Sequence, residues 1–214
     1  MSASSHGLIV AAVLSIGLLV TSPFAQDIGL MLRGFGFSLV SVVIAILLSL
    51  LLGLAVSILA TSSEHARKAF IPLVELAQSV PVFALLPLLL IHFGSSSVPI
   101  LIVLILGTIW PILFAIIGSS RSDHHWKIIG PGLLAAVMLA WGQAWEIVIG
   151  AEILTNTFGV GHVLGDISAG GSAGSLAFAI LVYLLMLTLV NYFIWYPLVR
   201  ALNSTTPMPS PVPS

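Results

Sequence analysis

Charged side chains are scarce in this chain of 214 residues, because only 6% of them are Asp, Glu, Lys or Arg while 59% are hydrophobic. A soluble domain carries roughly 25% charged residues, so this composition excludes the hydrated surface of a water-soluble protein. Cysteine is absent, which excludes disulfides, thiolate metal sites and cysteine nucleophiles. The formal net charge of -1 gives no electrostatic reason to expect a nucleic acid as a partner.

The sequence consists largely of long apolar runs. A window of about 20 residues, the length that crosses the hydrocarbon of a bilayer, predicts about six transmembrane helices. The predicted spans are residues 7–24, 34–60, 69–93, 98–118, 131–151 and 175–199. We therefore expect an all-α membrane protein, a bundle of about six transmembrane helices in a lipid bilayer.

The first span is expected to be a retained helix and not a signal peptide. No Lys or Arg precedes it, and Pro23-Phe24-Ala25 is a poor cleavage site. With an even number of spans, both termini lie on one side, and Lys and Arg favour the cytoplasm. Cytoplasmic termini place five basic residues inside, namely Arg67, Lys68, Arg121, Lys127 and Arg200, and leave Arg33 as the exception.

These boundaries predict three parts of a multi-pass protein of the cell membrane (inner or plasma membrane) with both termini cytoplasmic. Residues 1–30 would be an N-terminal helix and outer loop, and residues 31–203 the transmembrane core. Residues 204–214 lack an apolar pattern and are rich in proline, which predicts a disordered cytoplasmic tail.

Small residues recur at every fourth position in two of the predicted spans. In lipid, helices associate by close packing, so small side chains mark the face that meets another helix. The second span has Ser41, Ala45, Ser49, Gly53, Ser57 and Thr61, and the fifth has Gly132, Ala136, Ala140 and Ala144. We expect both helices to lie inside the bundle.

The third span contains prolines that should interrupt it. Pro81 and Pro87 each remove a backbone donor and disturb the preceding turn, as does Pro72. Interrupted helices persist at membrane depth where the freed backbone faces protein or a watery cavity, which makes this span a candidate wall of a transport route. Glu75 and Gln78 lie one helical turn apart near its inner end, as route candidates or as polar side chains at the membrane interface. For the prolines themselves, a plain packing kink is the alternative.

The fifth span carries acidic and amide side chains. A charged group inside a membrane helix costs a few kcal/mol or more unless it is paired or hydrated, so Glu146 should not face lipid. Gly142 and Gly150 flank it at i−4 and i+4 and would allow another backbone to approach. Gln143 and Glu146 are candidate route residues, with a structural hydrogen bond as the alternative, and Glu152 near the outer end is a candidate for gating or packing.

Other site chemistries are not supported by the spacing of residues. The glycine-rich segment 158–174 lacks the Gly-Lys-Ser/Thr ending of a nucleotide-binding loop. His162 and Asp166 are spaced for a metal, but two ligands without a third are more often solvated polar residues. No Ser and His pair suited to hydrolysis stands out within the spans. We expect no catalytic residues, no metal and no cofactor.

Several segments, taken in chain order, carry a resemblance to a known family. They are Gln78-Ser-Val-Pro-Val-Phe-Ala-Leu-Leu-Pro-Leu-Leu-Leu-Ile-His-Phe-Gly94, Trp110-Pro-Ile-Leu-Phe, Pro131-Gly-Leu-Leu with Gly142-Gln-Ala-Trp145, Ala151-Glu-Ile-Leu154, Phe158-Gly-Val-Gly161 and Asn191-Tyr-Phe-Ile-Trp-Tyr-Pro-Leu-Val-Arg200. Together they resemble permease subunits of binding-protein-dependent ABC importers of the nitrate, sulfonate and taurine type, including the branch of duplicated anion permeases.

The resemblance implies an ABC importer type I permease-like fold with no enzymatic activity of its own. It implies a small solute, such as nitrate or a sulfonate, and three kinds of partner: a second permease subunit in a homo- or heterodimer, cytoplasmic ATPase subunits and an extracytoplasmic solute-binding protein. No cationic residue lies in the middle of a predicted span. An anion would therefore be held by backbone donors, hydroxyls or helix N-termini, which breaks at Pro81 and Pro87 would provide.

One segment departs from the family pattern. Members carry a cytoplasmic loop with a coupling helix between their fourth and fifth helices, and this chain has only a short segment, 118–130, in that place. Arg121, Trp126 and Lys127 are candidates for a reduced ATPase contact. The short segment is equally compatible with coupling through a partner permease, or with a degenerate homologue that no longer transports.

Two hypotheses from other classes stay open on the sequence. In an ion-coupled carrier or channel, Glu75, Glu146 and Glu152 would take up and release protons. In an assembly subunit, the chain would have no route of its own.

Overall fold

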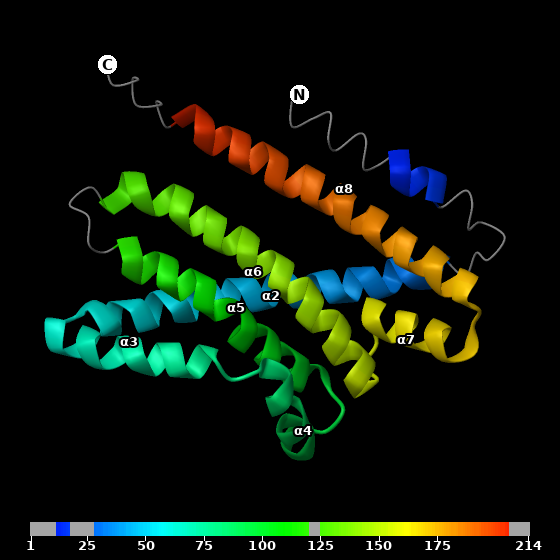
Figure 1. Cartoon of the computed structure of the whole chain (residues 1–214), viewed down its shortest axis with the longest axis horizontal. Helices are drawn as coiled ribbons and strands as arrows, with labels where there is room; N and C mark the ends of the chain where they lie inside the picture. Colours follow the sequence, from blue (N-terminus) through cyan, green and yellow to red (C-terminus); the bar gives the residue numbers. More distant parts are fainter. Residues whose placement is uncertain (1–11, 18–27, 120–124, 206–214) are drawn as a thin grey trace.

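The computed structural model describes residues 12–17, 28–119 and 125–205, and every regular element in that part of the chain is a helix (Figure 1). The expected all-α class is confirmed. The described residues contain four helices that are long and apolar enough to cross a membrane. They are α2 (Ile28–Thr61), α5 (Ser97–Ser119), α6 (His125–Thr155) and α8 (Ala173–Thr205). These helices contain four of the predicted spans.

The third predicted span, 69–93, forms two helices instead of one. α3 (Glu64–Gln78) and α4 (Val82–Phe93) meet at a bend of 82° and make a fifth, broken span or a re-entrant segment. Each is shorter than the roughly 20 residues that a straight crossing needs. Of the first predicted span, 7–24, only residues 12–17 are described, and they are helical. The described residues thus hold four or five of the expected six spans.

The interruption falls where Pro81 follows Val80. A proline disfavours the helical conformation in the residue before it, and Pro81 is the extended N-cap residue of α4. Ser79 ends α3, and its hydroxyl donates to the carbonyl oxygen of Leu76 at 2.6 Å. The expected interruption is confirmed here. The expectation of a second break at Pro87 is wrong, since α4 runs through this residue.

Segments expected on the cytoplasmic side gather at one end of the bundle, on the left of Figure 1. The C-terminal ends of α2, α5 and α8 lie at this end with the N-terminal ends of α3 and α6. Lys68 of α3 and Arg200 of α8 therefore share one end of the protein. The opposite end holds the start of α2, with Arg33, and the short helix α7 (Val160–Gly170), with Asp166.

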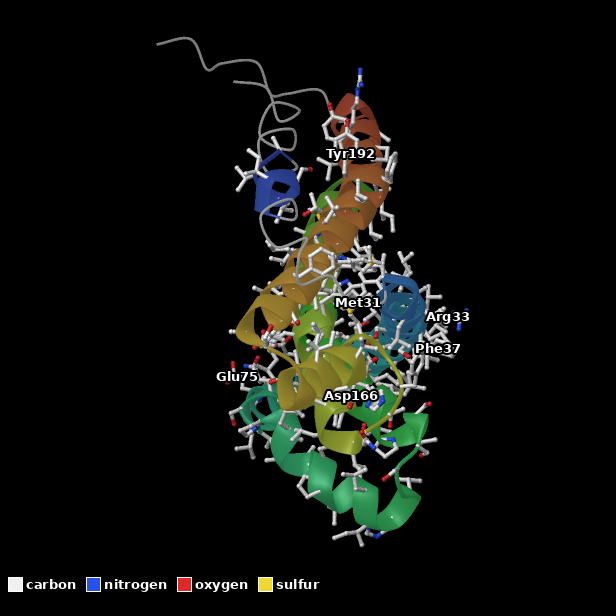
Figure 2. The ribbon with its side chains drawn as sticks, turned by 90° about the vertical axis from the view of Figure 1, so that its right-hand side faces the viewer. Met31, Arg33, Phe37, Glu75, Asp166 and Tyr192 are labelled. Carbon is white, nitrogen blue, oxygen red and sulfur yellow. The ribbon has the colours of Figure 1, made fainter. Side chains whose placement is uncertain are left out.

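Helix α5 packs between α2 and α6, and its contact with α2 runs along the predicted stripe of small residues. Ala45, Ser49, Gly53 and Ser57 are buried, and Ser41 is half-buried. The Ser49 Oγ lies 2.8 Å from the Thr108 Oγ1 of α5 and donates to a carbonyl oxygen of that helix. The stripe is therefore a helix-facing surface, as expected. In Figure 2, Arg33 and Phe37 project from the other side of α2, whereas Met31 points inward.

The stripe on α6 is confirmed in part. Ala136, Ala140 and Ala144 are buried, but Gly132 is exposed, and a Cβ added there would meet no atom within 4 Å.

Aromatic side chains join α2 and α6 to α8 in the core. Phe35 stacks on Trp145 with ring centroids 4.9 Å apart, and Trp141 meets Trp195 edge-on at 5.7 Å. The indole Nε1 of Trp141 donates to the Asn191 Oδ1 at 2.7 Å, which satisfies a polar group inside the bundle. These rings fix α8 against helices that it otherwise contacts lightly.

A valine in place of Gly53 should destabilise the bundle. A Cβ at this position would lie 3.2 Å from the Ile112 Cγ2, so the branched side chain would push α2 away from α5. We expect a loss of about 1–3 kcal/mol in stability, measured as a lower midpoint of thermal unfolding in detergent. Gly36→Val is the matched control, because a Cβ at Gly36 of the same helix meets nothing within 4 Å. Equal destabilisation by both variants would contradict the packing argument.

Candidate functional site

A cavity of about 550 Å³ lies beside the break between α3 and α4. Its walls come from the break itself, from α5 and from α6. The described lining residues include Gln78, Pro81, Phe83, Trp110, Gln143 and Glu146. We call this space the break cavity. It combines the interrupted span with the acidic part of α6, two features that are far apart in the sequence.

The polar side chains of the break cavity come mainly from α6. Glu146 is exposed in the single chain although it lies inside a candidate membrane span. Gln143 is half-buried, and its Oε1 is buried without a hydrogen-bond donor among the described residues. Both side chains therefore lie on a polar strip of α6 that needs water, a ligand or another protein beside it.

The glycines around Glu146 do not act as expected. A Cβ at Gly142 would meet nothing within 4 Å, so no backbone of the described residues approaches there. At Gly150 the close neighbour is a side chain, because a Cβ would lie 2.8 Å from the Cζ of Phe83. Phe83 is in the first turn of α4. Gly150 thus allows the Phe83 ring of α4 to pack against α6.

The structure divides the predicted route residues into two groups. Gln78, Pro81, Gln143 and Glu146 meet at the break cavity. The other three, Glu75, Pro87 and Glu152, do not line it. Glu75 and Pro87 are exposed, and Glu75 projects away from the ribbon in Figure 2. Glu152 belongs to a different, buried arrangement.

Glu152 connects three helices near the outer end of the bundle. Its Oε1 accepts a hydrogen bond from the Ser38 Oγ of α2 at 2.7 Å, and its Oε2 accepts one from the backbone N–H of Gly161 at 2.8 Å. Ser38 in turn accepts from the Val160 N–H at 2.9 Å. The side chain of Glu152 is only 2% exposed. We call these four residues the α7 cap.

The α7 cap supplies hydrogen-bond acceptors for the first backbone N–H groups of α7. Gly159 is the N-cap residue of α7 and has no side chain with which to accept from the first N–H groups. A carboxylate from α6 and a hydroxyl from α2 take that role, and the carboxylate also faces the positive end of the helix dipole. Glu152 therefore joins α6 to α2 and α7 in the described structure.

The glycines of Phe158-Gly-Val-Gly161 let the backbone come this close. A Cβ on Gly159 would overlap the Glu152 carboxyl group, and one on Gly161 would overlap the carbonyl oxygen of Ile149. Gly34 of α2 is also needed, since its Cβ would lie 2.9 Å from the Gly159 oxygen. The glycine-rich segment is thus a packing device between α2, α6 and α7.

Two further groups of residues in the sequence are the His162 and Asp166 pair and the candidate ATPase contacts. His162 and Asp166 form an i, i+4 pair on α7, with Nε2 and Oδ2 3.4 Å apart. Within the described ranges, no group of three or more His, Asp or Glu is placed to hold a metal ion. Of the candidate ATPase contacts, Arg121 lies outside the described residues, as do the side chains of Trp126 and Lys127.

Three residues of these sites were not predicted from the sequence: Ser38 as a partner of Glu152, and Phe83 and Trp110 as cavity walls. Ser38 could have been found, because Gly34 and Ser38 continue the small-residue face of α2 toward its start. Phe83 and Trp110 had no such signal, since aromatic side chains are common in membrane helices and only the bend of α4 brings these two together.

The chain is similar in sequence to several known permease proteins. No protein-family model matches the chain. The nitrate import permease protein of Leptolyngbya laminosa is 26% identical over 180 residues, covering 74% of this chain and 64% of the relative. The taurine transport system permease protein of Escherichia coli (strain K12) is 27% identical over 178 residues, covering 71% of this chain and 65% of the relative. The chain thus spans less than two thirds of these relatives.

A permease protein assigned to aliphatic sulfonate transport in Bacillus subtilis (strain 168) is 25% identical over 214 residues, covering 88% of this chain and 76% of the relative. The described helices have the length and composition of a multi-pass membrane protein, and the matches make the chain similar to permease proteins. More narrowly, the chain is a distant homologue of the ABC importer permeases for nitrate, taurine and aliphatic sulfonates.

Replacing Glu152 with alanine should loosen α7 without unfolding the protein. The Gly161 N–H and the Ser38 hydroxyl would lose their shared acceptor, and a hydrogen bond to a charged group contributes about 1.5–3 kcal/mol. We expect amide hydrogen exchange over Val160–Leu164 to become about tenfold faster or more. Glu146→Ala should leave this segment unchanged, because Glu146 has no part in the α7 cap. Unchanged exchange in Glu152→Ala would show that the cap does not hold α7.

A methyl group on Gly159 should be far more harmful than one on Gly170. The first would overlap the Glu152 carboxyl group, whereas the second meets nothing within 4 Å on the same helix. We expect Gly159→Ala to lower the yield of monodisperse protein and its unfolding midpoint, with a loss of about 1–3 kcal/mol. Gly170→Ala should match the unchanged chain. Similar behaviour of the two variants in size-exclusion chromatography and thermal unfolding would rule out the close approach.

Proposed function

We propose that the chain is one permease subunit of an ABC importer and that the break cavity is its share of a translocation route for a small solute. The observation that carries the proposal is the exposed Glu146 within a membrane span, beside an interrupted helix. A carboxylate facing hydrocarbon is costly, so this face needs a partner or a hydrated path. The homology supports a permease in this role.

A second permease subunit is the partner that fits this face. The cavity is bounded by α3, α4, α5 and α6, and several of its walls, among them Gln78, Pro81 and Leu139, are exposed in the single chain. A second subunit placed against this side would cover the polar strip and enclose the route between the two chains. Both a like and a related subunit satisfy this requirement.

Orientation follows from the end of the bundle that gathers Lys68 and Arg200. By the positive-inside rule, this end faces the cytoplasm, and α7 with Asp166 faces outward. The solute would arrive on the outer side with an extracytoplasmic binding protein, and ATPase subunits would act on the inner side. Nitrate, taurine and sulfonates are the solutes that the relatives' names suggest.

Coupling to an ATPase is the step at which this chain differs from the family pattern. Only residues 120–124 separate the end of α5 from the start of α6, which leaves no room for a coupling helix between them. We therefore assign the main ATPase contact to the partner permease. The short loop with Arg121, Trp126 and Lys127 would add a reduced contact.

The ion-coupled alternative needs its three carboxylates along one path. The described structure does not provide this, because Glu146 lines the break cavity while Glu75 and Glu152 do not. Glu152 is enclosed by Ser38 and Gly161, which hold both of its oxygens. No observation favours this alternative over the importer.

Affinity purification of the full chain from its native membranes should recover a second permease and an ATPase. We expect Arg121→Ala/Lys127→Ala to weaken ATPase recovery by a fewfold at most, because the partner permease makes the main contact. Mass spectrometry of the purified material identifies the subunits. Purification without any ATPase or second permease, or solute flux driven by a proton gradient in liposomes that contain this chain alone, would refute the importer.

A further inference from the structure

Glu146 sets the charge of the break cavity. It is the only charged side chain among the described residues that line the cavity. The remaining polar side chains, Gln78 and Gln143, are neutral amides, and neither Lys, Arg nor His contributes to the described walls. A free anion entering this space would meet a carboxylate without a compensating cation.

The N-terminus of α4 contributes partial positive charge to the cavity, which opposes the negative charge of Glu146. Pro81, Val82 and Phe83 line the cavity at the start of this helix, where the backbone dipoles place roughly half a positive charge. This partial charge is smaller than the full negative charge of a carboxylate. The net field of the described walls therefore favours positive charge.

Aromatic walls supply a second feature suited to cations. Phe83, Trp110 and Phe114 come from α4 and α5 and share the cavity with Glu146. Aromatic faces attract organic cations, Trp most strongly, and the attraction grows when water is displaced. The buried Oε1 of Gln143 adds an acceptor without a donor among the described residues, which suits a ligand that carries N–H groups.

From these contributions we propose that the solute of this route carries a positively charged nitrogen, as an organic cation or a zwitterion, and is not a simple anion such as nitrate. The Glu146 carboxylate would hold the charged nitrogen, and the aromatic walls would cover its apolar part. The inference rests on the break cavity being the route, and it narrows the solute class that the relatives' names suggest.

Benzamidine and benzoate provide matched probes, because both are flat aromatic molecules of similar size and opposite charge. We would measure their binding to the full chain, with any subunits that co-purify, in nanodiscs, using empty nanodiscs as the blank. Benzamidine should bind at least about tenfold more tightly than benzoate. Glu146→Gln should reduce this preference to about threefold or less.

Asp166→Asn is the control, because it removes one acidic charge from α7, outside the cavity, and should keep the full preference. Three results would overturn the proposal: binding of neither probe, equal or tighter binding of benzoate, or an unchanged preference in Glu146→Gln that keeps its unfolding midpoint. Recovery of the ATPase is measured separately. If Glu146→Gln still co-purifies with the ATPase but keeps the preference for benzamidine over benzoate, only the cation assignment is refuted. If the unchanged chain does not co-purify with an ATPase, the importer itself is refuted.

Discussion

Hydrocarbon offers no hydrogen-bond partner to a peptide group, and the rest of this structure depends on that constraint. Four long helices satisfy it by themselves, since their backbone bonds close within one segment. Two helix ends in the described part of the chain have hydrogen-bond partners from side chains. At the break before Pro81, the Ser79 side chain bonds back to its own helix, and at α7 the cap is built from Ser38 and Glu152.

The two places differ in what surrounds them. The α7 cap is closed, because glycines let three backbones and a carboxyl group meet at contact distance. The break before Pro81 is open toward a cavity with an acidic wall. A closed polar site stabilises an arrangement of helices, whereas an open one can receive a solute. Glu146 and Glu152, which are neighbours on α6 and both candidates in the sequence, therefore lie in different surroundings: Glu146 in the open site and Glu152 in the closed one.

Packing of small residues explains why α5 lies at the centre. Ser49 and Gly53 let α2 approach α5 closely enough for a hydroxyl contact with Thr108, and α6 packs against α5 as well. α5 and α6, two of the helices that line the break cavity, are thereby packed into the bundle. The bent α4 completes the cavity by placing Phe83 against Gly150.

The sequence alone determined the membrane class, four of the spans, the interruption near Pro81 and the stripe of small residues on α2, because hydrophobic length, proline chemistry and small-residue spacing act locally. It could not determine that Pro87 leaves α4 intact, that Gly142 has no close neighbour, or that Glu146 and Glu152 have separate surroundings. Those facts depend on the 82° bend between α3 and α4 and on the contact of α7 with α2. Such contacts join residues far apart in the chain, and only the tertiary structure decided them.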